Sequence, residues 1–240
     1  MHLEPLAPPP PRTPLSRRSW LSIIGVLGLL AAALVAMAAD SHDPLDRLLG
    51  GTEMTGKRDE YRFLHTHPRG GTLPIGYDPC TPIVVTVDPD GAPDDYRDLV
   101  ETAMEHTSSA SGLSFDYAGP TSERNFSERD SSDPVLVLWA DADEVPELAG
   151  DVAGIGGSSM LTGTGRPYYV TGSIVLDRDN FEAGTSAASR QAILDHEFGH
   201  LVGLDHVNRI GELMNPSPRV TTYGRGDLRG LALLGQVPCS

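Results

Sequence analysis

Basic residues are scarce in this chain of 240 residues. Lysine and arginine together number 18 against 33 acidic residues, which gives a formal net charge of −15 at pH 7. A protein that binds nucleic acid needs a concentrated positive surface to neutralise phosphates, and the sequence contains no basic patch. Nucleic acid is therefore excluded as an expected partner. Internal repeats are also lacking, which argues against a repeat architecture.

Long apolar runs are absent except at residues 20–39, an uncharged and mainly apolar stretch of 20 residues. The segment before it is rich in proline and carries arginines. Positive charge on the N-terminal side predicts that the rest of the chain is exported across the membrane. Residues 1–39 are interpreted either as a signal peptide, with an A-x-A cleavage site at 36–38, or as an uncleaved anchor, because 20 residues suffice to span a bilayer. Membrane contact is expected only through this segment.

Cysteine is nearly absent, since Cys80 and Cys239 are the only two. They stand at the two ends of the region that follows residue 76. In an exported protein a cysteine pair usually forms a disulfide. This one would close a loop of about 160 residues, worth roughly 5 kcal/mol in the chain-entropy model. The sequence predicts a Cys80–Cys239 disulfide, with two unrelated thiols as the alternative.

Residues 40–75 lack a sustained apolar period and contain two glycine pairs, so we interpret them as a linker or a short pro-segment. His65 and His67 fall in this stretch. Two histidines at i, i+2 in a polar loop favour solvated side chains over a second metal site.

Residues 76–240 alternate between strand and helix patterns and are long enough for one globular core. The segment at 151–157 is weakened by glycine and suits a sheet edge. Ser186 is positioned to cap a helix that follows it. Strands are predicted at 83–87, 113–117, 135–139 and 151–157, and a hairpin or a single strand at 168–177. Helices are predicted from about 94 to 112, from 186 onward and at 227–234.

The sequence HEFGHLVGLDH, which begins at His196, carries the chemistry. His196 and His200 share one face of a helix, so their imidazoles can converge on one ion. Glu197 can reach a water on that ion, the arrangement in which zinc acidifies a water and the glutamate takes its proton. Gly203 allows the chain to leave the helix with positive φ, which brings His206 round as a third ligand. Three protein ligands leave an open position, which is typical of a catalytic zinc.

This motif is specific. From average residue usage, HExxH alone arises by chance in roughly one chain of this length in a couple of hundred. Adding the glycine and the third histidine at fixed positions lowers that to on the order of one in 10⁵. The zinc interpretation is therefore favoured over an amphipathic helix with incidental histidines.

HExxHxxGxxH followed by a methionine turn is the metzincin signature, and the chain resembles that group over about residues 77–240. The turn would be at Met214, eight residues past the third histidine. The resemblance implies that this methionine is an apolar floor beneath the ligands and does not bind metal. The short gap and Pro216 resemble matrixins, the matrix-metalloprotease branch, because astacins and serralysins carry tyrosine at that place. Asp205 and Asn215 depart from the commonest matrixin sequence.

The resemblance implies an α/β (α+β) fold of the zincin and metzincin type. Its expected parts are a twisted, mostly parallel sheet with an edge strand, two main helices and a small C-terminal subdomain. A peptide substrate would lie extended along the edge strand, at 152–157, and add backbone hydrogen bonds to the sheet. Residues after Met214 would form the wall of the primed-side pocket.

Two features common in matrixins are missing from the sequence. A propeptide switch needs Pro-Arg-Cys-Gly, but Cys80 lacks that arginine and glycine and runs directly into the strand at 83–87, so no cysteine switch is expected. A second, structural zinc needs extra histidines before the active-site helix, and none lies between His106 and His196. His106 is interpreted as a surface or partly packed residue.

Acidic residues in turns offer possible calcium ligands, because clustered carboxylates suit hard cations. Solvated turn acids are the favoured interpretation. The residues concerned are Asp141, Asp143, Asp177 and Asp179.

The sequence thus predicts an exported, monomeric zinc-dependent endopeptidase that acts on extracellular peptides or proteins, with Glu197 as general base. One alternative is a zinc amidase that acts on a non-protein amide, such as a cell-wall linkage. Another is a catalytically inactive zinc module that binds peptides. The intact Glu197 argues against the inactive module, since binding alone has no need of a general base.

Overall fold

The computed structural model describes residues 60–67, 72–163, 165–181 and 184–239. The predicted apolar segment at 20–39 lies outside these residues. Among the described residues, no helix is both long and apolar enough to cross a membrane.

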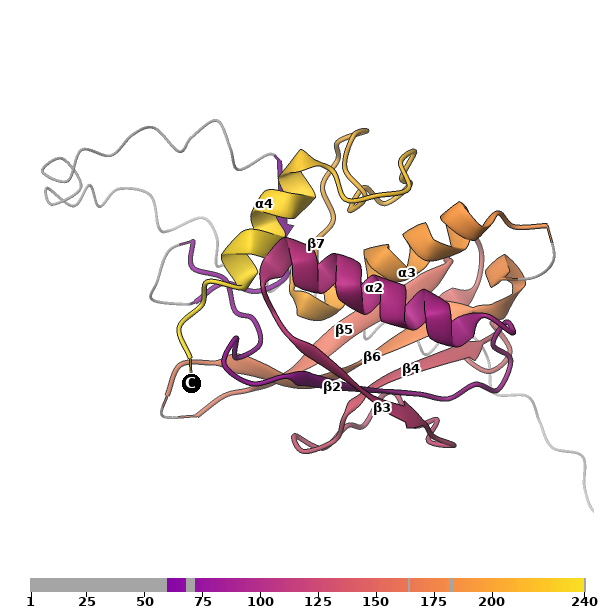
Figure 1. Ribbon diagram of the computed structural model, residues 1–240, viewed down its shortest axis with the longest axis horizontal. Helices are drawn as coiled ribbons and strands as arrows, with labels where there is room; N and C mark the ends of the chain where they lie inside the picture. The colour runs from indigo at the N-terminus through magenta and orange to yellow at the C-terminus, as the bar shows by residue number, and fades with distance from the viewer. Residues whose placement is uncertain (1–59, 68–71, 164, 182–183, 240) are drawn as a thin grey trace, which may run out of the picture. The chain divides into compact units, whose positions relative to one another are not determined.

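A five-stranded, mostly parallel sheet forms the centre of the domain (Figure 1). Neighbouring strands run parallel except at one edge, where β5 pairs with β6 in the antiparallel direction. This arrangement confirms the predicted fold class. The strands, in spatial order, are β3 (Phe115–Pro120), β2 (Ile83–Val87), β4 (Val135–Ala140), β6 (Tyr168–Asp177) and β5 (Gly154–Leu161).

The central strand β4 is buried along its whole length. Alternate side chains of a strand point to opposite faces, so Trp139 enters the main core and Leu138 enters a smaller core on the other face. Burial on both faces explains why the sequence shows a continuous apolar run here instead of alternation.

Helices α2 (Tyr96–Ser111) and α3 (Ala187–Val202) pack against each other on one face of the sheet (Figure 1). The hydroxyl of Ser186 accepts a hydrogen bond from the backbone N–H of Ser189, as expected of a helix cap. A third helix, α4 (Arg225–Leu234), belongs to the C-terminal part of the domain. Short 3₁₀ turns follow β4 and β6, at Pro146–Leu148 and Arg178–Phe181.

Strand β3 begins later than the sequence predicted. Gly112 ends α2 with φ of 81°, and the N–H of Leu113 then donates to the hydroxyl of Ser111 instead of to a strand. The turn after α2 therefore includes the first residues of the predicted strand, and β3 begins at Phe115. The edge strand β5 is likewise displaced toward the C-terminus, because pairing with β6 begins at Gly154.

Residues 60–67 pack onto the domain. Strand β1 (Arg62–Phe63) pairs antiparallel with β7 (Leu204–Asp205), and the N–H of Leu64 donates to the carbonyl of Gly203. The folded unit therefore includes residues of the segment that the sequence indicated as a linker or pro-segment.

The two cysteines are joined. Cys80, just before β2, forms a disulfide with Cys239, across a sequence separation of 159 residues. The bond is the one predicted from the sequence. It ties the end of the chain to the start of the central sheet.

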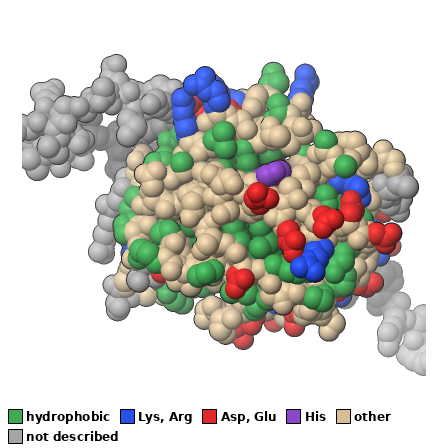
Figure 2. All heavy atoms as spheres, in the orientation of Figure 1, with side chains coloured by type: hydrophobic (Ala, Val, Ile, Leu, Met, Phe, Trp, Pro, Cys, Tyr) green, Lys and Arg blue, Asp and Glu red, His purple; other side chains and the backbone are tan. Residues whose placement is uncertain are grey.

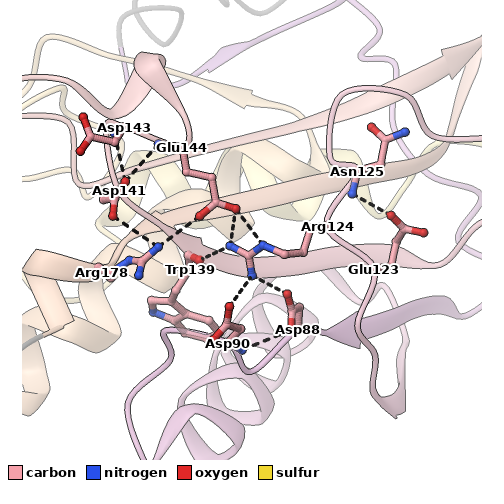
Figure 3. Close-up of polar contacts among 10 residues, drawn as sticks. All are labelled: Asp88, Asp90, Glu123, Arg124, Asn125, Trp139, Asp141, Asp143, Glu144 and Arg178. Atoms are coloured by element: carbon pink, nitrogen blue, oxygen red, sulfur yellow. Dashed lines mark hydrogen bonds and ion pairs between the residues drawn. The ribbon is translucent and has the colours of Figure 1, made fainter. Parts of the chain in front are cut away.

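Asp141 and Asp143, two of the acids that the sequence offers for calcium, follow β4 and lie beside a network of carboxylates and two arginines (Figure 3). Arg178 pairs with Asp141 at 3.5 Å and with Glu144 at 3.1 Å. Arg124 pairs with Glu144 and with the buried Asp88.

The remaining oxygens in this region bind backbone N–H groups of their own turns. One oxygen of Asp141 accepts from Asp143 and Glu144, and one of Asp177 accepts from Asp179. Within the described part of the chain, these acids belong to no group with metal-ligand spacing. The carboxylates of Asp141 and Asp177 therefore bind groups of their own turns, and that of Asp141 also pairs with Arg178.

Candidate metal centre and active-site cleft

Helix α3 supplies the first two histidines of the candidate site. His196 and His200 lie one turn apart, with ring centroids separated by 4.7 Å. The helix ends at Gly203, which has φ of 124°, a conformation that favours glycine. The chain then turns back through β7 and brings His206 beside the other two rings.

The three imidazoles converge on one point. The Nε2 atoms of His196, His200 and His206 each lie 3.1 Å from the other two. Three nitrogens bound to one tetrahedral zinc at about 2.0–2.1 Å would be about 3.3 Å apart. The spacing therefore fits a single metal ion, and the structure brings together all three ligands proposed from the sequence.

Backbone carbonyls fix the tautomers of two of these rings. Nδ1 of His196 lies 2.7 Å from the carbonyl oxygen of Leu213, and Nδ1 of His200 lies 2.8 Å from that of Leu204. A carbonyl can only accept a hydrogen bond, so Nδ1 carries the proton and Nε2 presents its lone pair. Lone pairs that face one another are stabilised by a cation, so the donor set suits a metal.

Electrostatics keep the histidines neutral. Burial, followed by the neighbouring imidazole of His200, lowers the pKa of His196 to about 3. Burial also lowers the pKa of His200 to about 4 and lowers the pKa of His206. The rings are therefore unprotonated at neutral pH, which is the form that binds a metal.

Glu197 lies next to the histidines and is 4% exposed. Its Oε2 atom is buried and has no hydrogen-bond partner among the described residues. Burial raises the pKa of Glu197 to about 8, and a cation on the adjacent imidazoles would favour the ionised form. An unpartnered carboxylate oxygen in this position can take a proton from a water in the cleft.

Strand β5 approaches Glu197 through two glycines on one face of the strand. A Cβ on Gly154 would lie 3.0 Å from Cγ of Glu197, and a Cβ on Gly156 would lie 2.6 Å from its carbonyl oxygen. The next residue of the strand points to the opposite face, and a Cβ on Gly157 would meet nothing within 4 Å. The sequence predicts an edge strand for these glycines but not this close approach to Glu197. Glycine at alternate positions of one strand was the available signal.

Met214 lies beneath α3. It is buried, and a Cβ on Gly199 would lie 2.5 Å from its sulfur. The turn before it is held by the fully buried Asp227 on α4, whose Oδ2 accepts from the N–H of Leu213 at 2.5 Å. The carbonyl oxygen of Leu213 accepts the hydrogen bond from Nδ1 of His196, so Asp227 supports a proposed ligand through Leu213. Asp227 lies outside the motif that the sequence reveals.

A pocket of about 570 Å³ opens beside this centre. Its lining includes His196, Glu197 and His206. One wall is formed by residues 151–154, at the start of β5, and the other by residues 216–221, after the methionine turn. The pocket has the position that the sequence analysis gave to the primed-side subsite.

Two other described histidines, His106 and His65, make contacts away from this centre. His106 lies 2.8 Å from the carboxylate of the buried Asp195, and His65 lies 2.8 Å from the hydroxyl of Tyr169. Among the described residues, neither belongs to a group with metal-ligand spacing. A second such group contains Cys80 and Cys239, but their sulfurs are joined in the disulfide and offer no thiolate.

Comparison with known proteins agrees with this geometry. The family model described as Matrixin matches residues 80–229, a span that includes the three histidines, Glu197 and Met214. A search of curated proteins returned no match. Because the matched span exceeds half of the chain, the protein belongs to the matrixin family.

Proposed function

We propose that this protein is an exported zinc-dependent endopeptidase that cleaves extracellular peptides or proteins. Matrixin membership supports a zinc-dependent peptidase. The observation that carries the finer assignment is the arrangement of three Nε2 atoms, mutually 3.1 Å apart, beside the unpartnered buried oxygen of Glu197. A purely structural zinc site would be closed by a fourth protein ligand.

The residues that would hold the zinc are His196, His200 and His206. The chemistry that zinc supplies when bound is Lewis acidity, which makes a water nucleophilic near neutral pH. Glu197 acts as the general base, and its Oε2 takes the proton as the water oxygen bonds to the scissile carbonyl carbon. The same carboxylic acid then donates this proton to the departing amine nitrogen when the C–N bond breaks.

The edge strand β5 offers a surface along which an extended peptide substrate can pair. β5 pairs with β6 on one side only, so its other edge is available to an extended peptide. Gly154 lies both on this strand and in the pocket beside the histidines. A peptide that extends along β5 would therefore pass its scissile bond close to Glu197.

Export rests on the apolar segment at 20–39 and is supported by the Cys80–Cys239 disulfide, since disulfides persist mainly in oxidising compartments. We propose that residues 1–39 direct or anchor the chain and that the catalytic domain acts as a monomer outside the cytoplasm. Mass spectrometry of the exported protein would show whether residues 1–39 are retained.

Metal removal tests the proposed activity. The full chain should cleave a diverse peptide library, lose that activity on dialysis against a chelator and regain it with zinc. Cleavage of cell-wall amides without cleavage of peptides would instead identify the amidase. Stoichiometric zinc binding with no hydrolysis of either substrate would identify the inactive binding module.

The glycine contact with Glu197 gives a sharper prediction. Gly154→Ala should lower kcat by about 10²-fold, because the added methyl group displaces the general base and a misplacement of about 1 Å costs that much. Gly157→Ala is the matched control, since its methyl group meets open space. Zinc content should stay unchanged in both variants, and only Gly154→Ala should alter the pH profile of kcat. Equal rates for the two variants would contradict the positioning role of Gly154.

A further inference from the structure

Some arginines of this acidic protein have no ionic partner among the described residues, and one of them lines the cleft. Lysine is absent from the described residues, so arginines are the only permanent cations there. Three of the described arginines, Arg209, Arg219 and Arg225, have neither an ion pair nor a side-chain hydrogen bond to another described residue. The others bind acids or carbonyl oxygens, as at Arg62, Arg97, Arg124, Arg129, Arg166, Arg178, Arg190 and Arg229.

These three residues follow the third histidine in the sequence, and the last of them is the first residue of α4. Figure 2 shows Lys and Arg side chains at the upper edge of the molecule and others lower down among acidic side chains. In a chain with net charge −15, an arginine without an acidic partner creates a local field of the opposite sign.

Arg219 is the one of the three that lines the pocket beside His196, Glu197 and His206. It is exposed, on the wall formed by 216–221. Asp151 lies on the opposite wall and makes no ion pair with it. The planar guanidinium therefore has its donors available to a group that enters between the walls.

The pocket is also suited to the stem of an acidic side chain. Ile193 of α3 and Val220 line it together with Arg219. Methylene groups of a glutamate can pack against these apolar side chains while its carboxylate reaches the arginine at the rim.

We propose that Arg219 selects substrates with an acidic side chain directly after the scissile bond. This inference rests on the proposed peptidase function and adds the substrate class to it. The arginine offsets the repulsion that the acidic protein otherwise exerts on an acidic peptide. Asp151 opposes binding of the same carboxylate, so its charge limits the preference.

Two peptides that differ only by Glu or Gln after the scissile bond test the inference, because they have the same shape and differ in charge. The zinc-loaded full chain should cleave the Glu peptide with kcat/KM about fivefold higher, the upper range for an exposed ion pair. Arg219→Gln should remove this preference and Arg219→Glu should reverse it, whereas Arg219→Lys should keep part of it. Asp151→Asn should raise kcat/KM for the Glu peptide.

Arg225→Glu is the matched control. Arg225→Glu changes the net charge by the same amount as Arg219→Glu, but Arg225 is an exposed arginine outside the pocket lining. The ratio of kcat/KM for the Glu peptide to that for the Gln peptide should stay within about twofold of wild type. Equal kcat/KM for the two peptides, or an equal loss of preference in both charge reversals, would overturn the role of Arg219.

Binding separates this inference from the proposed function. Cleavage of neither peptide would contradict the peptidase assignment. The affinities of both peptides for zinc-loaded Glu197→Gln would then be measured by calorimetry, with and without Arg219→Gln. The inference is supported, even without cleavage, if the Glu peptide binds more tightly than the Gln peptide and Arg219→Gln removes the difference. Equal affinities of the two peptides, or no binding of either, reject it.

Discussion

Glu197→Gln is expected to lower kcat by about 10²- to 10⁴-fold, the contribution of a general base, while zinc remains bound. Glutamine has nearly the shape of glutamate, so the packing against Gly154 is kept. Its amide cannot accept the proton that the attacking water must lose. The three histidines are untouched and should retain the metal. Peptide hydrolysis and zinc content are measured on the same sample.

Glu105→Gln serves as the control, because Glu105 is exposed on α2 and the substitution removes the same charge. Its kcat should match that of wild type. The comparison with His200→Ala is also informative, since that variant should lose both metal and activity. Near-wild-type turnover in Glu197→Gln would show that another group takes the proton, and the proposed mechanism would have to be abandoned.

The sequence predicted the parts of the site that depend on local geometry. A helix fixes the relation between His196 and His200 through its own period, and a glycine with positive φ is the usual way to leave a helix. These features need no knowledge of the rest of the chain. The order of strands and helices was predicted for the same reason, with errors of a few residues at the ends where turns replace strand pairing.

The supporting contacts could not be predicted, because they join residues far apart in the sequence. Asp227 reaches the turn before Met214 from α4, and β1 pairs with β7 across more than a hundred residues. Arg62 of β1 also forms an ion pair with Asp205 at 3.3 Å, beside the third histidine. The sequence noted Asp205 only as a departure from the family pattern, whereas the structure shows its partner.

The charge of the cleft is another property that only the fold reveals. Composition gives a net charge but does not say which arginines are neutralised. Arg178 and Arg219 look equivalent in the sequence, yet the first binds two carboxylates and the second lines the pocket without a partner. The proposed preference for an acidic substrate side chain depends on that difference.

The position of His206, the proposed third ligand, depends on backbone geometry as well as on its imidazole. Gly203→Val should therefore cause loss of zinc without changing any ligand. Gly203 has φ of 124°, which a β-branched residue resists. A Cβ there would also lie 3.0 Å from Leu234 and 3.2 Å from the carbonyl oxygen of Ile75. The turn would have to shift, and His206 would move with it.

Gly112→Val separates this effect from general backbone strain. Gly112 ends α2 with φ of 81°, and a Cβ on it would meet nothing within 4 Å. This variant should lose about 1–2 kcal/mol of unfolding free energy from the left-handed conformation, yet keep its zinc. If both variants lost zinc equally, the loss would reflect instability of the fold and not the position of His206.

His206→Ala should give the same result as Gly203→Val by the direct route. Structural zinc sites with four protein ligands have apparent binding free energies of about 10–16 kcal/mol. One ligand is therefore worth about 3 kcal/mol, and its loss should weaken zinc affinity about 10²-fold. Elemental analysis after dialysis against a mild chelator measures the loss in both variants. Among the described residues, no other histidine joins the group in which Nε2 of His206 lies 3.1 Å from those of His196 and His200. Full zinc retention in His206→Ala would mean that the third ligand lies elsewhere, and the convergence of the three rings would then have another cause.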